Sequence, residues 1–190
     1  MIELLTGIFS AFGLSASAGL NAYIPLMVIA LIARFTDWFQ LQAPFDTLAN
    51  PWIIGLLAVL IVIESLADSF PAVNHVNDII QTFVRPAAGA IAFAASAQVL
   101  TDVSPVLSLA CGVLVAGGVH TVKAAAVRPA VTASTGGAAN PVVSITEDIV
   151  ATVTSVLAML IPVLMGILLI LFVSLLIWWL WRRMNRVQTA

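Results

Sequence analysis

Long apolar stretches, separated by short polar or proline-containing breaks, run through this chain. Residues 4–33 contain no charged side chain, and neither do residues 149–181. A membrane-spanning helix needs about 20 apolar residues, so each stretch is too long for one straight crossing. Each also contains a break, at residues 15–19 in the first and at Pro162 in the second. We therefore predict one span of two half-helices in the first stretch and two spans in the second, with one helix kinked at Pro162 as the alternative.

Prolines mark the ends of the apolar runs between these stretches. Asn50-Pro51 opens one run, and Arg128-Pro129 ends another. Proline favours the first turn of a helix and disfavours its interior. The pattern predicts an all-α integral membrane protein with about six transmembrane helices. After the broken first span, the predicted spans are residues 52–67, 87–100, 106–127, 142–160 and 163–181.

Residues 130–141 contain too many turn signals for a regular helix. Gly136-Gly137 and Asn140 lie within this segment, and such residues favour turns. We predict either a broken, re-entrant segment or a plain cytoplasmic loop. Irregular backbone at membrane depth must line protein or a water-filled cavity. Asn21 and Asn140, one beside each break, would then contact a permeant species in that cavity.

Residues 72–84 differ from the apolar spans because apolar and polar positions follow a helical period. The apolar positions are Val73, Val76, Ile80 and Phe83, and the polar ones are Asn74, His75, Asn77 and Asp78. An amphipathic helix of this kind lies in the membrane interface. We predict one such interfacial helix here, ended by Arg85-Pro86.

The composition agrees with a membrane protein and excludes other classes. Of the 190 residues, 62% are hydrophobic and 8% are charged, whereas about 25% are charged in soluble domains. The net charge of −2 and the absence of a basic run argue against nucleic-acid binding. The single Cys111 allows neither an intrachain disulfide nor a cysteine metal site. We expect one transmembrane domain, residues 1–181, followed by a short basic cytoplasmic tail, residues 182–190.

Basic residues orient the predicted spans, because they concentrate on the cytoplasmic side of a membrane. Arg182, Arg183 and Arg186 follow the last span, which indicates a cytoplasmic C-terminus. Counting back through six spans also places the N-terminus in the cytoplasm. Six of the seven basic residues are then cytoplasmic, with Arg34 as the exception.

Ionisable residues near the cytoplasmic ends of the spans are the candidates for function. They are Glu64, Asp68, His120, Lys123, Glu147 and Asp148. A charged group at the centre of a span costs about 2.5–3.5 kcal/mol on insertion scales, so it needs a partner or a purpose. Glu64 and Asp68 are four residues apart and share a helix face. A proton, a cation or a basic residue is therefore expected between them.

Two interpretations of these residues are open. They form structural bridges, such as Glu64 with Lys123, or they form a protonatable or ion-binding site. Four of these residues are of types that could also bind a metal, although their spacing is not specific for a metal site. They are Glu64, Asp68, His120 and Glu147. We predict no metal and no cofactor.

Sequence motifs of zinc proteases, nucleotide-binding loops and serine hydrolases are missing. We therefore expect no enzyme but a small membrane transporter or channel with a cytoplasm-facing polar cavity, linked to a proton or cation. The alternatives are a non-catalytic scaffold or accessory subunit, and a lipid-modifying intramembrane enzyme. The expected partners are the lipid bilayer, a small ion or solute, and further copies of the chain, because so small a bundle needs copies of itself to enclose a pore.

Five sequence segments together resemble a known family. They are residues 17–26 (SAGLNAYIPL), 64–68 (ESLAD), 84–90 (VRPAAGA), 123–129 (KAAAVRP) and 134–148 (STGGAANPVVSITED). From about residue 8 to 160 the chain resembles a bacterial inner-membrane family catalogued as a domain of unknown function, DUF4126. This resemblance implies a multi-pass protein of the bacterial cytoplasmic (inner) membrane. It implies no activity, substrate or assigned site.

Overall fold

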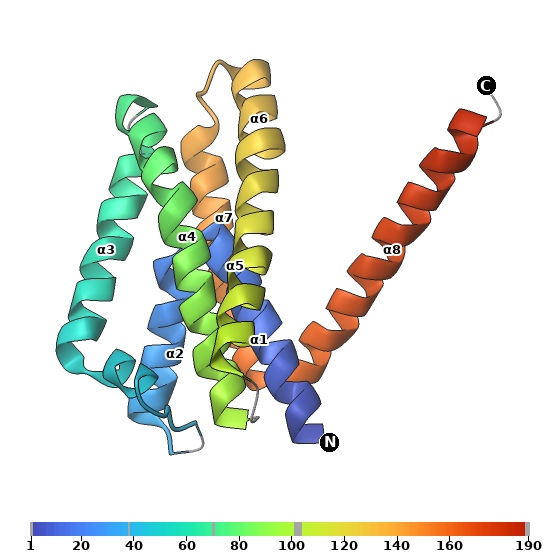
Figure 1. The fold of residues 1–190 in the computed structure, drawn as a ribbon. Coiled ribbons are helices and arrows are strands. Elements are labelled where there is room, and N and C mark those ends of the chain that lie inside the picture. The colour runs from blue at the N-terminus through green and yellow to red at the C-terminus, as the bar shows by residue number, and fades with distance from the viewer. Residues whose placement is uncertain (1, 38, 70, 101–103, 189–190) are drawn as a thin grey trace.

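The regular structure is helical, as predicted (Figure 1). The computed structural model describes residues 2–37, 39–69, 71–100 and 104–188, without the side chains of 2–4, 68–69, 71–75, 98–100, 180 and 183–188. Within these ranges the helices are α1 (Ile2–Leu20), α2 (Tyr23–Phe35), the 3-10 helix η1 (Phe45–Ala49), α3 (Pro51–Ser69), α4 (Pro71–Leu100), α5 (Pro105–Val122), the π-helical segment η2 (Lys123–Val127), α6 (Arg128–Thr135), α7 (Asn140–Leu160) and α8 (Pro162–Gln188).

Four helical stretches in the described part of the chain are long and apolar enough to cross a membrane. They are Val76–Ala97, Pro105–Thr135, Asn140–Leu160 and Pro162–Trp179. The apolar parts of α1, α2 and α3 are shorter. Large apolar side chains cover the outside of the bundle, including Trp52, Leu114 and Phe172. A surface of this kind is stable in lipid, so the fold is that of a multi-pass membrane protein.

Helix α1 lies against α4, α5 and α7 and forms the centre of the bundle (Figure 1). Its serine hydroxyls donate to backbone carbonyls of neighbouring helices. Ser10 donates to Ala158 at 2.7 Å and Ser17 donates to Ala151 at 2.8 Å, both in α7. Ser15 donates to a carbonyl of α5 at 2.9 Å. These bonds satisfy buried hydroxyls and fix α1 antiparallel to α7.

The chain reverses between α1 and α2, which corrects the prediction of one broken span. Residues 15–19 continue α1 as regular helix, and the break falls at Asn21 and Ala22. Gly19 instead allows close packing, because an added methyl group there would overlap the backbone of α5. Figure 1 shows α2 returning toward the end of the bundle where α1 begins. Helix α1 therefore starts at the end of the bundle opposite to the end of α8, whereas the six-span prediction places both termini on one side of the membrane.

Residues 72–84 form the first half of α4 and not a separate interfacial helix. Helix α4 runs without interruption through Pro86. The predicted helical period is correct, but the apolar face points outward and the polar face points into the protein. Phe83 is 76% exposed on the outer surface, whereas Gln81 and Arg85 are buried. In lipid the apolar face points outward and the polar face is satisfied inside the protein.

Helix α5 continues past the predicted stop at Arg128-Pro129. The π-helical segment η2 leads directly into α6, so residues 128–135 are helical and only residues 136–139 form a turn. Gly136 and Gly137 have φ values of 62° and 89°, which suit glycine best. The prediction that residues 130–141 form no regular helix is therefore wrong for the first part of that segment.

Two separate helices form the C-terminal stretch, as predicted, and not one helix kinked at Pro162. Helix α7 ends at Leu160 and α8 begins at Pro162, with a non-helical residue between them. Figure 1 shows α8 leaving the bundle at an angle. Helix α8 extends to Gln188, so residues 182–188 continue this helix.

Glycines allow the backbones of α4 and α5 to touch. A methyl group added at Gly112 in α5 would overlap the backbone of α4 at Gly89 and Ala90. Gly89 itself faces Ser15 and Ala116. In a membrane no hydrophobic effect drives helices together. Small residues of this kind stabilise their association by allowing close van der Waals contact.

The substitution Gly112→Ala is expected to lower the free energy of unfolding by about 1–3 kcal/mol, because the added methyl group must push α4 away from α5. The matched control is Gly55→Ala, since an added methyl group at Gly55 in α3 meets nothing within 4 Å. Thermal unfolding of both variants in the same detergent measures the difference. Equal melting temperatures would contradict this packing.

Candidate functional site

A buried arginine in α4 joins three helices. Arg85 is 1% exposed, and its Nη2 donates to Oε1 of Glu64 in α3 at 2.9 Å. Its Nη1 lies 3.1 Å from Nδ1 of His120 in α5. A guanidinium only donates, so Nδ1 accepts and a neutral His120 carries its proton on Nε2. That nitrogen lies 3.2 Å from Oγ1 of Thr82 and can donate to it.

A second group of charges begins about one turn beyond His120, where η2 follows α5. Lys123 is 3% exposed, and its Nζ lies 2.6 Å from Oε2 of Glu147 in α7. The same Nζ donates to the carbonyl of Leu20 at the end of α1 at 3.1 Å. Arg128 lies 3.8 Å from Oε2 of Glu147 and 3.2 Å from Oδ2 of Asp78. Glu147 is therefore shared by two basic residues.

The π-helical segment explains how one carboxylate reaches two basic residues. Lys123 and Arg128 are five residues apart, and the backbone N–H of Arg128 donates to the carbonyl of Lys123. In an α-helix with 3.6 residues per turn, these side chains would point about 140° apart around the axis. The wider π turn brings them onto one side, toward Glu147. Single π turns of this kind occur frequently at functional sites.

Asp148 anchors the turn between α1 and α2. Its Oδ1 accepts from Nδ2 of Asn21 at 2.9 Å, and its Oδ2 accepts from Oγ of Ser65 at 3.3 Å. Oδ1 of Asn21 also accepts from the backbone N–H groups of Tyr23 and Ile24, at 3.0 and 3.1 Å. Asn21 thus caps α2 while it contacts α7, which explains why the chain reverses here.

Seven charged or titratable side chains in these two neighbouring groups are called the charge network below: Glu64, Arg85 and His120 in the first, and Asp78, Lys123, Arg128 and Glu147 in the second. The hydroxyl of Thr82 links the groups, because it contacts His120 and donates to the backbone carbonyl of Asp78. Within it three arginine or lysine charges face three carboxylates, so the network is neutral with a neutral His120. Two buried polar atoms beside it, Oε1 of Gln81 and Nε of Arg85, have no protein partner among the described residues. Such atoms are commonly satisfied by buried water.

Several predicted residues meet here, but not in the predicted pairs. Glu64 pairs with Arg85 instead of Lys123, because α4 lies beside α3. His120 and Glu147 belong to the network, and Asn21 and Asp148 form the adjacent contact. Asn140 lies apart, with its Nδ2 3.4 Å from Oγ1 of Thr132. The side chain of Asp68 lies outside the described residues.

The sequence interpretation missed the contribution of α4 and α6. The predicted interfacial helix places Asp78 on a water-facing surface, and the predicted helix ends place Arg85 and Arg128 at stops beside proline. Their spacing does carry a signal. Asp78, Gln81 and Arg85 follow each other at steps of three and four, which defines one polar stripe on a continuous helix.

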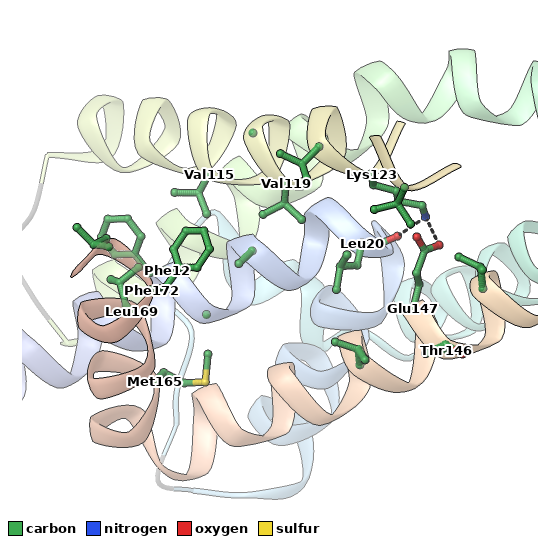
Figure 2. A pocket seen from close by; sticks show the side chains of 18 of the residues that line it. Phe12, Leu20, Val115, Val119, Lys123, Thr146, Glu147, Met165, Leu169 and Phe172 are labelled. Atoms are coloured by element: carbon green, nitrogen blue, oxygen red, sulfur yellow. Dashed lines mark hydrogen bonds and ion pairs between the residues drawn. The ribbon is translucent and has the colours of Figure 1, made fainter. Parts of the chain in front are cut away.

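Two cavities border the charge network. The lateral groove, of about 930 Å³, lies between α1, α5, α7 and α8, and Lys123 and Glu147 form its polar end (Figure 2). Phe12, Met165 and Phe172 line its apolar end. A smaller cavity, of about 340 Å³, is lined by His120 and by other residues of α4 and α5. The network therefore lies between two spaces on different sides of α5.

The groups gathered here are ones that can exchange protons or pair with cations. They are three carboxylates and an imidazole, each within contact distance of a basic side chain. Among the described residues, no group of three or more His, Cys, Asp and Glu side chains is placed to hold a metal ion.

The substitution Arg85→Gln is expected to lower the free energy of unfolding by about 3–5 kcal/mol, because it leaves the buried Glu64 carboxylate without its guanidinium. The double variant Glu64→Gln/Arg85→Gln should be more stable than Arg85→Gln alone, since no buried charge then lacks its counter-charge. Thermal unfolding in detergent tests this. A double variant less stable than the single one would show that the ion pair does not control stability.

Comparisons with known proteins agree with the sequence resemblance. Residues 8–182 match the family described as a domain of unknown function, DUF4126. Neither the curated proteins nor the solved structures contain a match. The matched segment includes every residue of the charge network and nearly the whole bundle, so the chain belongs to the DUF4126 family.

Proposed function

We propose that this protein is a small membrane transporter whose charge network binds a proton or a cation. The observation that carries this proposal is the burial of an ionisable network between two cavities, within helices apolar enough to cross a membrane. Ionisable groups at such depth are costly, and they mark ion or proton pathways in membrane proteins. The π-helical segment beside Lys123 supports the same assignment.

The proposed coupling step occurs at Glu147. Both Lys123 and Arg128 approach this carboxylate, at 2.6 and 3.8 Å. A proton or cation bound there removes the counter-charge of both basic residues at once. They then have to move toward other acceptors, such as Asp78 for Arg128. The π turn, which is less stable than α-helix, provides a segment whose rearrangement costs little.

The proposed orientation places the charge-network end of the bundle in the cytoplasm of a bacterial cell. The turn at residues 136–139, the network and the C-terminal arginines lie at this end, and residues 39–50 lie at the other (Figure 1). Basic residues favour the cytoplasmic side. With α1 and α2 running in opposite directions, the start of α1 is then external.

A second candidate function is that of a non-catalytic scaffold or accessory subunit. The observation that favours it is the almost complete burial of Glu64 and Arg85, at 2% and 1% exposure. Under this alternative the pair has a structural role alone and holds α3 against α4. Loss of the pair then lowers the free energy of unfolding, and the wild-type protein itself shows no transport activity.

The substitution Glu64→Gln is expected to reduce proton flux at least about tenfold, because the amide cannot carry the proton that a carboxylate can. The protein is reconstituted into vesicles that contain a pH-sensitive dye, and the decay of an imposed pH gradient is followed with and without a potassium gradient. Asp46→Asn makes the same chemical change on an exposed residue of η1 and serves as the control.

Two outcomes would contradict the transport proposal. One is unchanged flux in Glu64→Gln. The other is wild-type flux no faster than in protein-free vesicles, for protons and for potassium. If Glu64→Gln is too unstable to reconstitute, Glu64→Gln/Arg85→Gln removes the same carboxylate together with its partner and is measured in its place.

Cysteine labelling tests the orientation. After replacement of Cys111 by serine, Asp46→Cys should react with a membrane-impermeant maleimide on intact cells, whereas Ala138→Cys should react only after permeabilisation. Both positions are exposed at opposite ends of the bundle. The reverse labelling pattern would invert the proposed orientation.

A further inference from the structure

The lateral groove is unlike the rest of the lipid-facing surface because it ends at buried charges. Large apolar side chains cover much of the outer surface of the described residues, as lipid requires. In the groove, apolar walls from α1, α5, α7 and α8 lead to Lys123 and Glu147 at one end (Figure 2). Its volume of about 930 Å³ lies within the range of about 300–1,000 Å³ that is typical of small-molecule sites.

The groove runs in the direction of a lipid acyl chain. Along α1 it extends from Phe12 to Leu20, eight residues that correspond to about 12 Å of helix. Glu147 follows Asn140, the start of α7, by seven residues, which is about 11 Å of helix rise. The hydrocarbon core of a bilayer is about 30 Å thick. The polar end of the groove therefore lies nearer to the charge-network side of the bilayer, and the apolar end lies toward its middle.

Lys123 has a donor to offer at this level. An ammonium group carries three N–H donors. Within the described residues, the ammonium group of Lys123 contacts two acceptors, Oε2 of Glu147 and the carbonyl of Leu20. A phosphate oxygen suits the third donor, because hydrogen bonds between ionised groups are about twice as strong as neutral ones.

We propose that the lateral groove binds one phospholipid taken from the leaflet at the charge-network end. Its phosphate accepts from Lys123, and one acyl chain fills the space between Phe12 and Phe172. A helix of a second copy fits less well, because the obvious candidate, the apolar α8, has no charged residue between Pro162 and Trp181 to meet Lys123. This proposal goes beyond ion coupling and stands whether or not the charge network transports protons.

Native mass spectrometry of the detergent-purified protein tests the groove. Gly118→Leu should reduce phosphatidylglycerol binding at least about tenfold, because Gly118 lines the groove where it borders the smaller cavity, and a leucine there narrows the groove. Gly55→Leu makes the same change in α3, away from the groove, and should bind as the wild type does. In both cases an added Cβ meets nothing within 4 Å, so neither substitution should impair folding.

The phosphate contact is tested by comparing two lipids with the same acyl chains. Wild-type protein should bind phosphatidylglycerol about tenfold more tightly than diacylglycerol, and Lys123→Gln should abolish this preference because it removes one charge-assisted hydrogen bond. Equal lipid binding by Gly118→Leu and wild type would overturn the proposal. So would loss of a dimer in Gly118→Leu with unchanged lipid binding, which would identify a second copy as the occupant. Proton flux is not the readout, so these results are independent of the Glu64→Gln experiment.

Discussion

The interaction on which the site depends is the neutralisation of Arg85 inside an apolar bundle. Arginine remains charged under all relevant conditions, so lipid cannot accept it and the protein must supply both a counter-charge and hydrogen-bond acceptors. Glu64 of α3 provides the counter-charge and accepts one hydrogen bond, and His120 of α5 accepts another. This one requirement fixes the rotation of α4, because the face that carries Arg85 must point inward. Phe83 and the other apolar residues of α4 are then left facing the lipid.

Close helix packing makes these short polar contacts feasible. Gly89 and Gly112 bring the backbones of α4 and α5 together, and Gly19 does the same for α1 and α5. Serine hydroxyls of α1 then reach backbone carbonyls of α5 and α7 directly. Without a hydrophobic effect between helices, such contacts and the ion pairs together provide most of the specific association.

The same architecture creates both a buried polar interior and an open apolar side. Helices α3 to α7 carry the charge network, whereas α8 diverges from the bundle (Figure 1) and borders the lateral groove. Lys123 and Glu147 belong to both regions. A ligand in the groove would therefore contact the one ion pair whose carboxylate is shared with Arg128, so occupancy of the groove and the state of the network would be physically coupled.

Hydrophobic pattern and composition were sufficient to determine the class of the protein, because a chain with 8% charged residues can be solvated only by lipid. They also identified the helix break at Pro162 and the ionisable residues Glu64, His120, Lys123 and Glu147. The direction of α2, the continuity of α4 through Pro86 and the partner of Glu64 were decided by tertiary structure. A periodic pattern distinguishes two faces of a helix but does not state whether the polar face meets water or protein. Only the placement of α3 and α5 beside α4 provided the partners that turned this face inward.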